Sequence, residues 1–131
     1  MYYSKILIIE DEDFIAMDLQ NKFKYWGYST TMIASSQEAL KIANKIKPDI
    51  ILINIDLKDN NGINLAQKIT NNSDSAIVYI TGYLDEKNMK LMRSTKPYGY
   101  ISTPFEENQL KYTVEDAIYR HKLHQWFILS K

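Results

Sequence analysis

The sequence predicts an α/β fold in which five parallel strands form a doubly wound sheet covered by helices on both faces. Five short apolar runs alternate with five stretches whose apolar residues recur at helical spacing. This alternation is typical of a parallel sheet, and right-handed crossovers leave few ways of ordering its strands. A chain of 131 residues suits one domain of this kind.

Each expected strand is a short run rich in β-branched residues. Ile6–Ile9 and Ile50–Ile53 are unbroken apolar runs, the pattern of strands that are buried on both faces of a sheet. Tyr28–Ile33 contains β-prone threonines, and Ala76–Ile80 and Tyr98–Ser102 complete the set. Four of these runs lead directly into polar residues, so one edge of the sheet should be polar.

The helices are expected between these strands. Apolar residues at helical spacing indicate helices over Ile15–Trp26, Ala39–Ile46, Ile63–Ile69 and Lys87–Met92, and from Glu106 almost to the end of the chain. Gly27 is a natural C-terminal stop for the first of them. Either Ser35 or Ser36 can cap the second.

Composition excludes several classes of protein. Sixteen basic residues balance sixteen acidic ones, whereas a nucleic-acid binder usually carries a basic excess. The absence of cysteine excludes disulfides and thiolate metal sites and suits a reducing compartment. We find no apolar run of transmembrane length and no signal-peptide layout at the N-terminus. The expectation is a cytoplasmic protein that binds neither nucleic acid nor membrane.

Oxygen-bearing side chains follow the expected strands. In an open parallel sheet, ligands bind beyond the carboxyl ends of the strands. Three acidic side chains, an amide and two hydroxyls stand there, namely Glu10, Asp11, Asp56, Asn54, Thr81 and Thr103. Carboxylates gathered in this way suit Mg²⁺. No glycine-rich phosphate loop is present, which argues against a nucleotide site.

These motifs together resemble the receiver domain of response regulators, from end to end of the chain. The matching segments are Ile6–Glu12, Lys47–Ile53, Ile80–Gly82, Tyr98–Ile101 and Thr103–Phe105. The resemblance implies a flavodoxin-like sheet of strand order 2-1-3-4-5 and a role in two-component phosphorelay signalling, with a histidine kinase or another signalling protein as partner. The receiver domain should cover residues 1–122, with an extension of the last helix over residues 123–131.

The resemblance also implies roles for individual residues. Glu10 and Asp11 match the acidic pair that holds Mg²⁺, with Asp11 the more direct ligand, and Asp56 matches the position that offers a backbone carbonyl to the metal. Thr81 matches the hydroxyl that binds the phosphoryl group, and Tyr100 the aromatic residue that changes rotamer on activation. Each also has a simpler interpretation: helix N-terminal charges for the acidic pair, strand-end hydrogen bonding for Thr81 and packing for Tyr100.

Two positions depart from the family pattern. Asn54 stands where the family has the aspartate that accepts the phosphoryl group, and Thr103 stands at the lysine position before Pro104. An amide has no anionic oxygen to act as nucleophile, and a threonine cannot neutralise a phosphate. We therefore expect a domain that is not phosphorylated in the usual way and acts through protein contacts made by its fourth and fifth strands and helices.

Other interpretations stay open. Asp56 or Asp59 could replace the missing acceptor, or position 54 could have been altered from aspartate. Asn54 could also be only a turn-forming residue. A Mg²⁺-dependent phosphohydrolase is the alternative from a different class. It lacks an evident nucleophile and general base, so we expect no enzyme.

The last expected helix continues beyond the length that the sheet needs. Its sheet-packing residues are Leu110, Val114, Ala117, Ile118 and His121. Leu123, Trp126 and Phe127 follow, and an exposed apolar cluster more often marks a partner surface than a frayed tail. We expect a homodimer contact there, or a helix that leads to another module. His121 and His124 are expected to be solvated at the surface.

Overall fold

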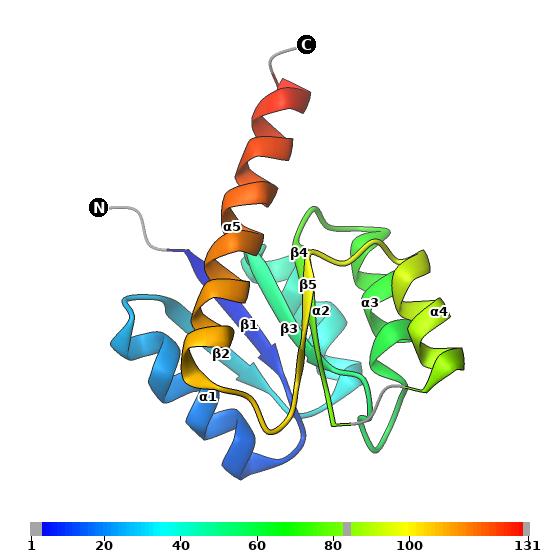
Figure 1. Cartoon of the computed structure of the whole chain (residues 1–131). Helices are drawn as coiled ribbons and strands as arrows, with labels where there is room; N and C mark the ends of the chain where they lie inside the picture. The colour runs from blue at the N-terminus through cyan, green and yellow to red at the C-terminus, as the bar shows by residue number, and fades with distance from the viewer. Residues whose placement is uncertain (1–3, 83–84, 130–131) are drawn as a thin grey trace.

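The computed structural model describes residues 4–82 and 85–129 and contains one five-stranded parallel sheet (Figure 1). Its strand order is β2-β1-β3-β4-β5, so the predicted fold class and topology are confirmed. The strands are β1 (Lys5–Ile9), β2 (Ser29–Ile33), β3 (Ile50–Asn54), β4 (Ala76–Thr81) and β5 (Gly99–Ser102). The first and third strands lie at the centre, where their apolar runs are buried on both faces.

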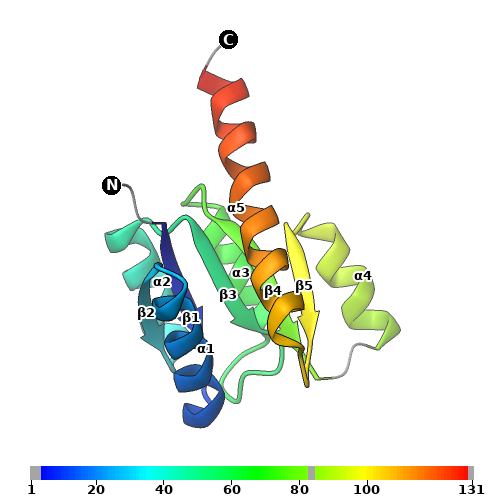
Figure 2. The same ribbon diagram turned by 60° about the vertical axis from the view of Figure 1, so that its left-hand side comes forward.

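Helices cover both faces of this sheet (Figures 1 and 2). They are α1 (Asp13–Tyr25), α2 (Ser36–Ile46), α3 (Gly62–Thr70), α4 (Glu86–Ser94) and α5 (Glu107–Leu129). Helices α1 and α5 lie on one face and α2, α3 and α4 on the other. Both views show the last turns of α5 projecting past the amino-terminal edge of the sheet, at the end opposite to the carboxyl ends of the strands.

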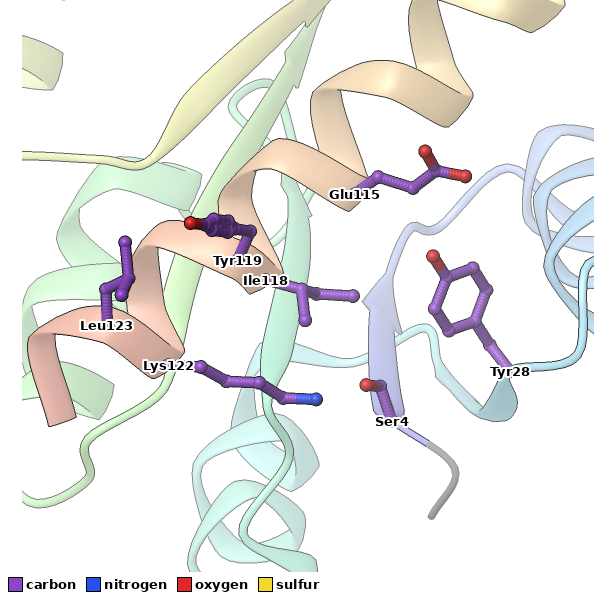
Figure 3. A pocket seen from close by; sticks show the side chains of 7 residues that line it. All are labelled: Ser4, Tyr28, Glu115, Ile118, Tyr119, Lys122 and Leu123. Atoms are coloured by element: carbon purple, nitrogen blue, oxygen red, sulfur yellow. The ribbon is translucent and has the colours of Figure 1, made fainter. Parts of the chain in front are cut away.

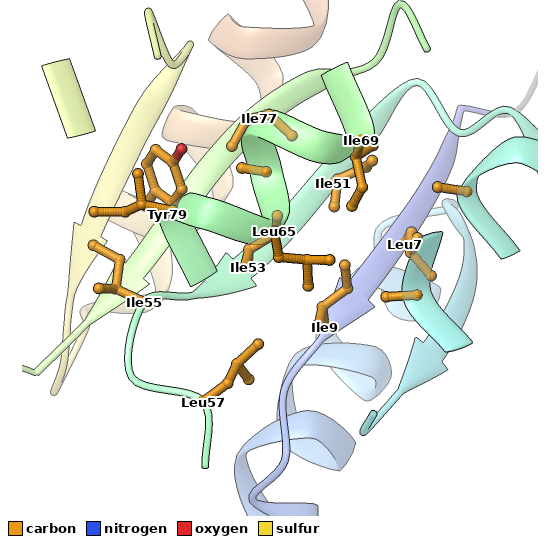
Figure 4. Packing of buried hydrophobic residues seen from close by; sticks show 14 of the residues in the cluster. Leu7, Ile9, Ile51, Ile53, Ile55, Leu57, Leu65, Ile69, Ile77 and Tyr79 are labelled. Atoms are coloured by element: carbon orange, nitrogen blue, oxygen red, sulfur yellow. The ribbon is translucent and has the colours of Figure 1, made fainter. Parts of the chain in front are cut away.

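Two apolar cores result, because alternate residues of each strand point to opposite faces. Leu7 and Ile9 of β1 belong to the core under α2 and α3, where Tyr79 is fully buried (Figure 4). Ile6 and Ile8 belong to the other core, under α1 and α5. The sheet separates the two cores, so its central strands are packed on both faces.

Side-chain caps set the beginnings of three helices. Ser35 accepts a hydrogen bond from the Gln37 N–H at 3.2 Å, so of the two candidate serines it is the N-cap of α2. Asn61 accepts from the Ile63 N–H at 2.7 Å at the start of α3. Asp85 is the N-cap of α4, and its side chain accepts from the Asn88 N–H at 2.7 Å. The helix therefore begins at Glu86, one residue before the expected start.

The prediction that His121 is solvated at the surface is wrong. His121 is 2% exposed, and its ring packs edge-to-face against Tyr98 with ring centroids 5.4 Å apart. Its Nε2 atom lies 3.4 Å from Asp74 Oδ1. The reason is helical periodicity: His121 follows Val114 by seven residues and therefore shares the sheet-facing side of α5. His124 is exposed, as expected.

No helix in residues 4–82 and 85–129 is both long and apolar enough to cross a membrane.

Candidate functional site

The site lies at the carboxyl end of the central strands, where β1 and β3 run side by side. The two strands pair in register as far as Ile9 and Ile53, so the residues that follow, Glu10 and Asn54, are neighbours. The Asn54 amide Nδ2 donates to Glu10 Oε2 at 2.8 Å. Glu10 Oε2 also accepts from the Asp11 N–H at 3.0 Å. The sequence predicted this meeting of strand ends correctly.

The orientation of the Asn54 side chain follows from its second contact. Its Oδ1 accepts a hydrogen bond from the Asp56 N–H at 2.8 Å, and only an oxygen can accept there. The amide nitrogen must therefore face Glu10, where it supplies a donor to a carboxylate. Asn54 thus bridges the end of β1 to the loop that follows β3.

Glu10 is a buried carboxylate. Only 2% of the residue is exposed, and its Oε1 atom is buried with no hydrogen-bond partner among the described residues. Burial raises the pKa of the Glu10 carboxyl above its ordinary value, and the neighbouring charge of Asp11 adds to the rise. The hydrogen bond from Asn54 and those from the backbone pull the pKa back part of the way.

The loop between β3 and α3 is tied down by two further carboxylates. Asp11 Oδ2 accepts from the Lys58 N–H at 2.7 Å. Asp59 Oδ2 accepts from both the backbone N–H of Ser36 at 3.0 Å and its hydroxyl at 2.8 Å. These two bonds lower the pKa of Asp59. The Asp59 carboxylate is therefore engaged at the start of α2, and it does not point at Asn54.

A close backbone contact holds α3 against the same loop. A Cβ atom added at Gly62 would lie 2.1 Å from the Asn54 backbone oxygen, which no side chain tolerates. The Gly62 N–H donates to the Ile55 carbonyl at 2.8 Å, and Asp56 and Asn61 form an isolated antiparallel bridge. The role of Gly62 could not be predicted from the sequence, where its only signal is a glycine directly before an apolar helix.

The remaining three positions of the family pattern lie at the end of β4, within β5 and directly after β5. Thr81 is buried, and its carbonyl accepts from the Thr103 N–H at 2.9 Å. Thr103 is half-buried and precedes Pro104 through a cis peptide bond. Tyr100 pairs in register with Tyr79, on the face covered by α4, and is 50% exposed. None of the side chains at these three positions carries a positive charge.

A divalent cation needs several oxygen ligands that converge on one point. Among the described residues, no group of three or more His, Cys, Asp or Glu side chains could hold a metal ion. The Asp56 side chain is exposed and does not join the carboxylates of Glu10 and Asp11. The role expected of Asp56, through its backbone carbonyl, stays a prediction. The carboxylates of Glu10 and Asp11 remain, and the unpartnered Glu10 Oε1 is an atom that a cation would satisfy. These two residues fit Mg²⁺.

The apolar residues at the end of α5 are exposed, as the sequence predicted. Trp126 and Phe127 are 61% and 57% exposed and contact each other edge-to-face. Leu123 is 42% exposed. This group lies at the opposite end of the molecule from Glu10 and Asn54.

Comparison with known proteins gives consistent matches. The chain is 29% identical over 119 residues to the transcriptional regulatory protein PdtaR of Mycobacterium tuberculosis, which covers 90% of this chain and 58% of that protein. It is 29% identical over 115 residues to the TorCAD operon transcriptional regulatory protein TorR of Escherichia coli K12, covering 88% of this chain and 50% of that protein. The chain thus spans little more than half the length of these curated relatives.

Solved structures agree with this. The signal receiver domain of a modulated diguanylate cyclase from Desulfovibrio desulfuricans G20 superposes with a TM-score of 0.87 at 26% identity, covering 94% of this chain and 99% of that one. The N-terminal domain of a response regulator/sensory box/GGDEF protein from Carboxydothermus hydrogenoformans gives 0.85 at 28% identity, covering 92% and 98%. The sequence profile of the response regulator receiver domain matches residues 6–115. The chain therefore belongs to the response regulator receiver domain family of two-component signalling proteins.

Proposed function

We propose that this receiver domain signals through protein contacts and does not accept a phosphoryl group in the usual way. The proposal rests on the hydrogen bonds of the Asn54 side chain. Its Nδ2 is bound to Glu10 and its Oδ1 to the Asp56 N–H, so both ends of the amide are engaged. An acyl phosphate forms on an anionic carboxylate oxygen, which an amide does not have.

The residues around Asn54 support the same conclusion. Thr103 stands where the family has a lysine, and a threonine offers a hydrogen bond without the positive charge that stabilises a bound phosphate. Asp59, one substitute acceptor, is held by two hydrogen bonds from Ser36. Asp56, the other, has an exposed side chain next to a backbone that is already tied to Asn54.

Magnesium binding is a separate part of the proposal. Receiver domains generally bind Mg²⁺ at the phosphorylation site, and Glu10 and Asp11, with the backbone carbonyl of Asp56, would hold the ion in this chain. Bound there, Mg²⁺ would neutralise the acidic pair. The unpartnered Glu10 Oε1 supports this assignment. Because Asn54 already donates to Glu10 Oε2, we expect the fold to be stable without the ion.

Receiver domains are generally non-catalytic and interact with histidine kinases and effector domains, and we propose the same kind of partner here. The contact surface would combine β4, α4, β5 and α5 of the receiver domain, residues 1–122. The extension over residues 123–131 would add Leu123, Trp126 and Phe127 to it. We propose no enzymatic reaction.

The experiment is a phosphorylation assay read by intact-protein mass. The chain is incubated with Mg²⁺ and acetyl phosphate, and in parallel with beryllofluoride while its amide spectrum is recorded. We expect no added mass, and no change in the backbone amide signals of Asn54, Thr81 or Tyr100 when beryllofluoride is added to a sample that already contains Mg²⁺. Asn54→Asp is the matched variant, because it restores the acceptor on the same scaffold. A stable adduct on the unaltered chain, at Asp56 or Asp59, would overturn the proposal.

A further inference from the structure

The outward side of α5 carries a stripe of exposed aromatic residues. Tyr112, Tyr119 and Trp126 recur every seven residues and are 65%, 57% and 61% exposed. Leu123, which is 42% exposed, lies between the last two, and these four residues are called the outer stripe. Residues seven apart lie nearly above one another on a helix, so the outer stripe runs straight along α5.

The outer stripe is separate from the packing of α5 on the sheet. The residues that α5 buries are Leu110, Val114, Ala117, Ile118 and His121. Tyr112 and Tyr119 each lie two residues along the helix from one of these, which at 3.6 residues per turn is more than half a turn away. One side of α5 is therefore fully used by the core, while the outer stripe, with charged residues between its aromatic ones, faces solvent. Exposed aromatic side chains gathered along one side of a helix favour an interaction site.

A groove next to the outer stripe extends the same surface (Figure 3). Its volume is about 460 Å³, and it lies between α5 and the residues that precede β1 and β2. Figure 3 shows Tyr119 and Leu123 on one side of it and Tyr28 on the other. Glu115 and Lys122 also line it, so an acidic and a basic side chain stand at this apolar surface.

The order of charges along α5 favours one kind of partner. Glu115 and Asp116 precede Tyr119, while Arg120 and Lys122 follow it. Asp116 and Arg120 pair within the helix at 2.9 Å. When two copies of α5 lie antiparallel across a two-fold axis at Tyr119, each Glu115 approaches the Lys122 region of the other copy. A parallel arrangement would instead set like charges against each other.

We propose that a second copy of this chain covers the outer stripe, with the two α5 helices antiparallel and crossing at Tyr119. In this dimer Tyr112 of each copy packs near Trp126 of the other, and the same patch serves both subunits. The inference rests on the proposal that the chain acts through protein contacts, and it names the partner. It is independent of whether Asn54 accepts a phosphoryl group.

Single-cysteine cross-linking tests the arrangement, because the chain has no cysteine of its own. Tyr119→Cys should form a disulfide-linked dimer on mild oxidation, since this residue meets its own copy at the axis. Tyr112→Cys alone and Trp126→Cys alone should form no disulfide-linked dimer, whereas an equal mixture of the two should cross-link. Tyr25→Cys, at an exposed position on α1, is the control and should not cross-link. Self-cross-linking of Tyr112→Cys and Trp126→Cys would indicate parallel helices and overturn the proposal.

Sedimentation equilibrium tests the association itself. The chain should dimerise reversibly, and Trp126→Ala should weaken the dimer by about tenfold or more, because each dimer loses two aromatic contacts. Tyr25→Ala removes an aromatic side chain on α1 that is even more exposed than Trp126, and it should leave the dimer unchanged. Circular dichroism confirms that both variants are folded. A chain that is monomeric throughout, or whose outer stripe is protected only by a different protein, contradicts the inference. Either result leaves the phosphorylation assay of the proposed function unaffected.

Discussion

The amide of Asn54 donates to the buried carboxylate of Glu10 across 2.8 Å, and this contact joins the ends of the two central strands. In a buried acidic site, such a hydrogen bond stabilises the negative charge of the Glu10 carboxylate, which has lost its contact with water. A bound cation would stabilise the same charge.

Replacing Asn54 with aspartate should make the stability of the domain depend on Mg²⁺. The substitution removes the hydrogen bond from Asn54 to Glu10 and places a second carboxylate against the buried Glu10 carboxylate. The repulsion should lower the free energy of unfolding by about 1–3 kcal/mol in EDTA. Millimolar Mg²⁺ should restore most of this loss and should affect the unaltered chain less. Urea denaturation with and without the ion measures both. Asn21→Asp, an exposed change of the same charge on α1, is the control. Equal Mg²⁺ responses in the two variants would argue against the role given to Asn54.

Asp59 should contribute an acid-sensitive part of the stability. Hydrogen bonds from Ser36 lower its pKa in the folded state, so the stabilisation is present above the unfolded-state value near 3.8 and is lost as the pH falls through the folded-state pKa. Asp59→Asn should therefore be less stable than the unaltered chain at pH 7, and the difference should shrink in acid. Denaturation curves recorded between pH 2 and pH 7 measure it. Ser36→Ala should reduce the same pH-dependent difference; if it does not, Ser36 is not the cause.

Gly62→Ala should strongly destabilise the domain. The added Cβ would meet the backbone oxygen of Asn54, and backbone cannot move aside as a side chain can. We expect a loss of about 1–3 kcal/mol in the free energy of unfolding, the usual cost of overpacking. Gly82→Ala is the comparison, because its Cβ would meet only the hydroxyl oxygen of Thr103, at 3.1 Å. Similar losses in the two variants would show that the close contact at Gly62 is relieved cheaply.

Asp74 should hold the last turns of α5 to the body of the domain. Its two carboxylate oxygens face His121 Nε2 at 3.4 Å and Gln125 Nε2 at 3.1 Å, one helical turn apart. Asp74→Ala should cost about 0.5–1.5 kcal/mol. It should also speed hydrogen exchange of the backbone amides in residues 122–129 more than elsewhere. Asn72→Ala, in the same loop, is the matched control. Uniform exchange along α5 in both variants would contradict a local role for Asp74.

The architecture could be predicted because its strands are unbroken apolar runs and their ends carry the polar residues. Ile6–Ile9 and Ile50–Ile53 needed no tertiary information, and a parallel sheet brings Glu10 and Asn54 together wherever the loops go. The contacts that fix the loop could not be predicted in this way. Lys58 contributes only a backbone N–H to Asp11, and the bond between Ser36 and Asp59 joins residues 23 apart. Neither leaves a pattern in the sequence.

His121 shows a different limit. Its spacing from Val114 assigned it to the packed side of α5, while its polar side chain suggested solvent, and the spacing proved the better guide. What satisfies the buried ring is Tyr98 and Asp74, which come from distant parts of the chain. The residue type of His121 predicted an exposed side chain, but its position on the helix placed it in the core.

The length of α5 has a mechanical consequence. Its 23 residues begin near the loop that follows β5 and end beyond the opposite edge of the sheet. At 1.5 Å per residue the helix is about 35 Å long, so a tilt of about 5° at its base would swing the tip by about 3 Å. Because the buried residues of α5 extend from Leu110 to His121, such a tilt requires the packing along that length to shift with the helix. The helix would then act as a rigid lever whose longer arm rests on the sheet, and its projecting end would carry Trp126.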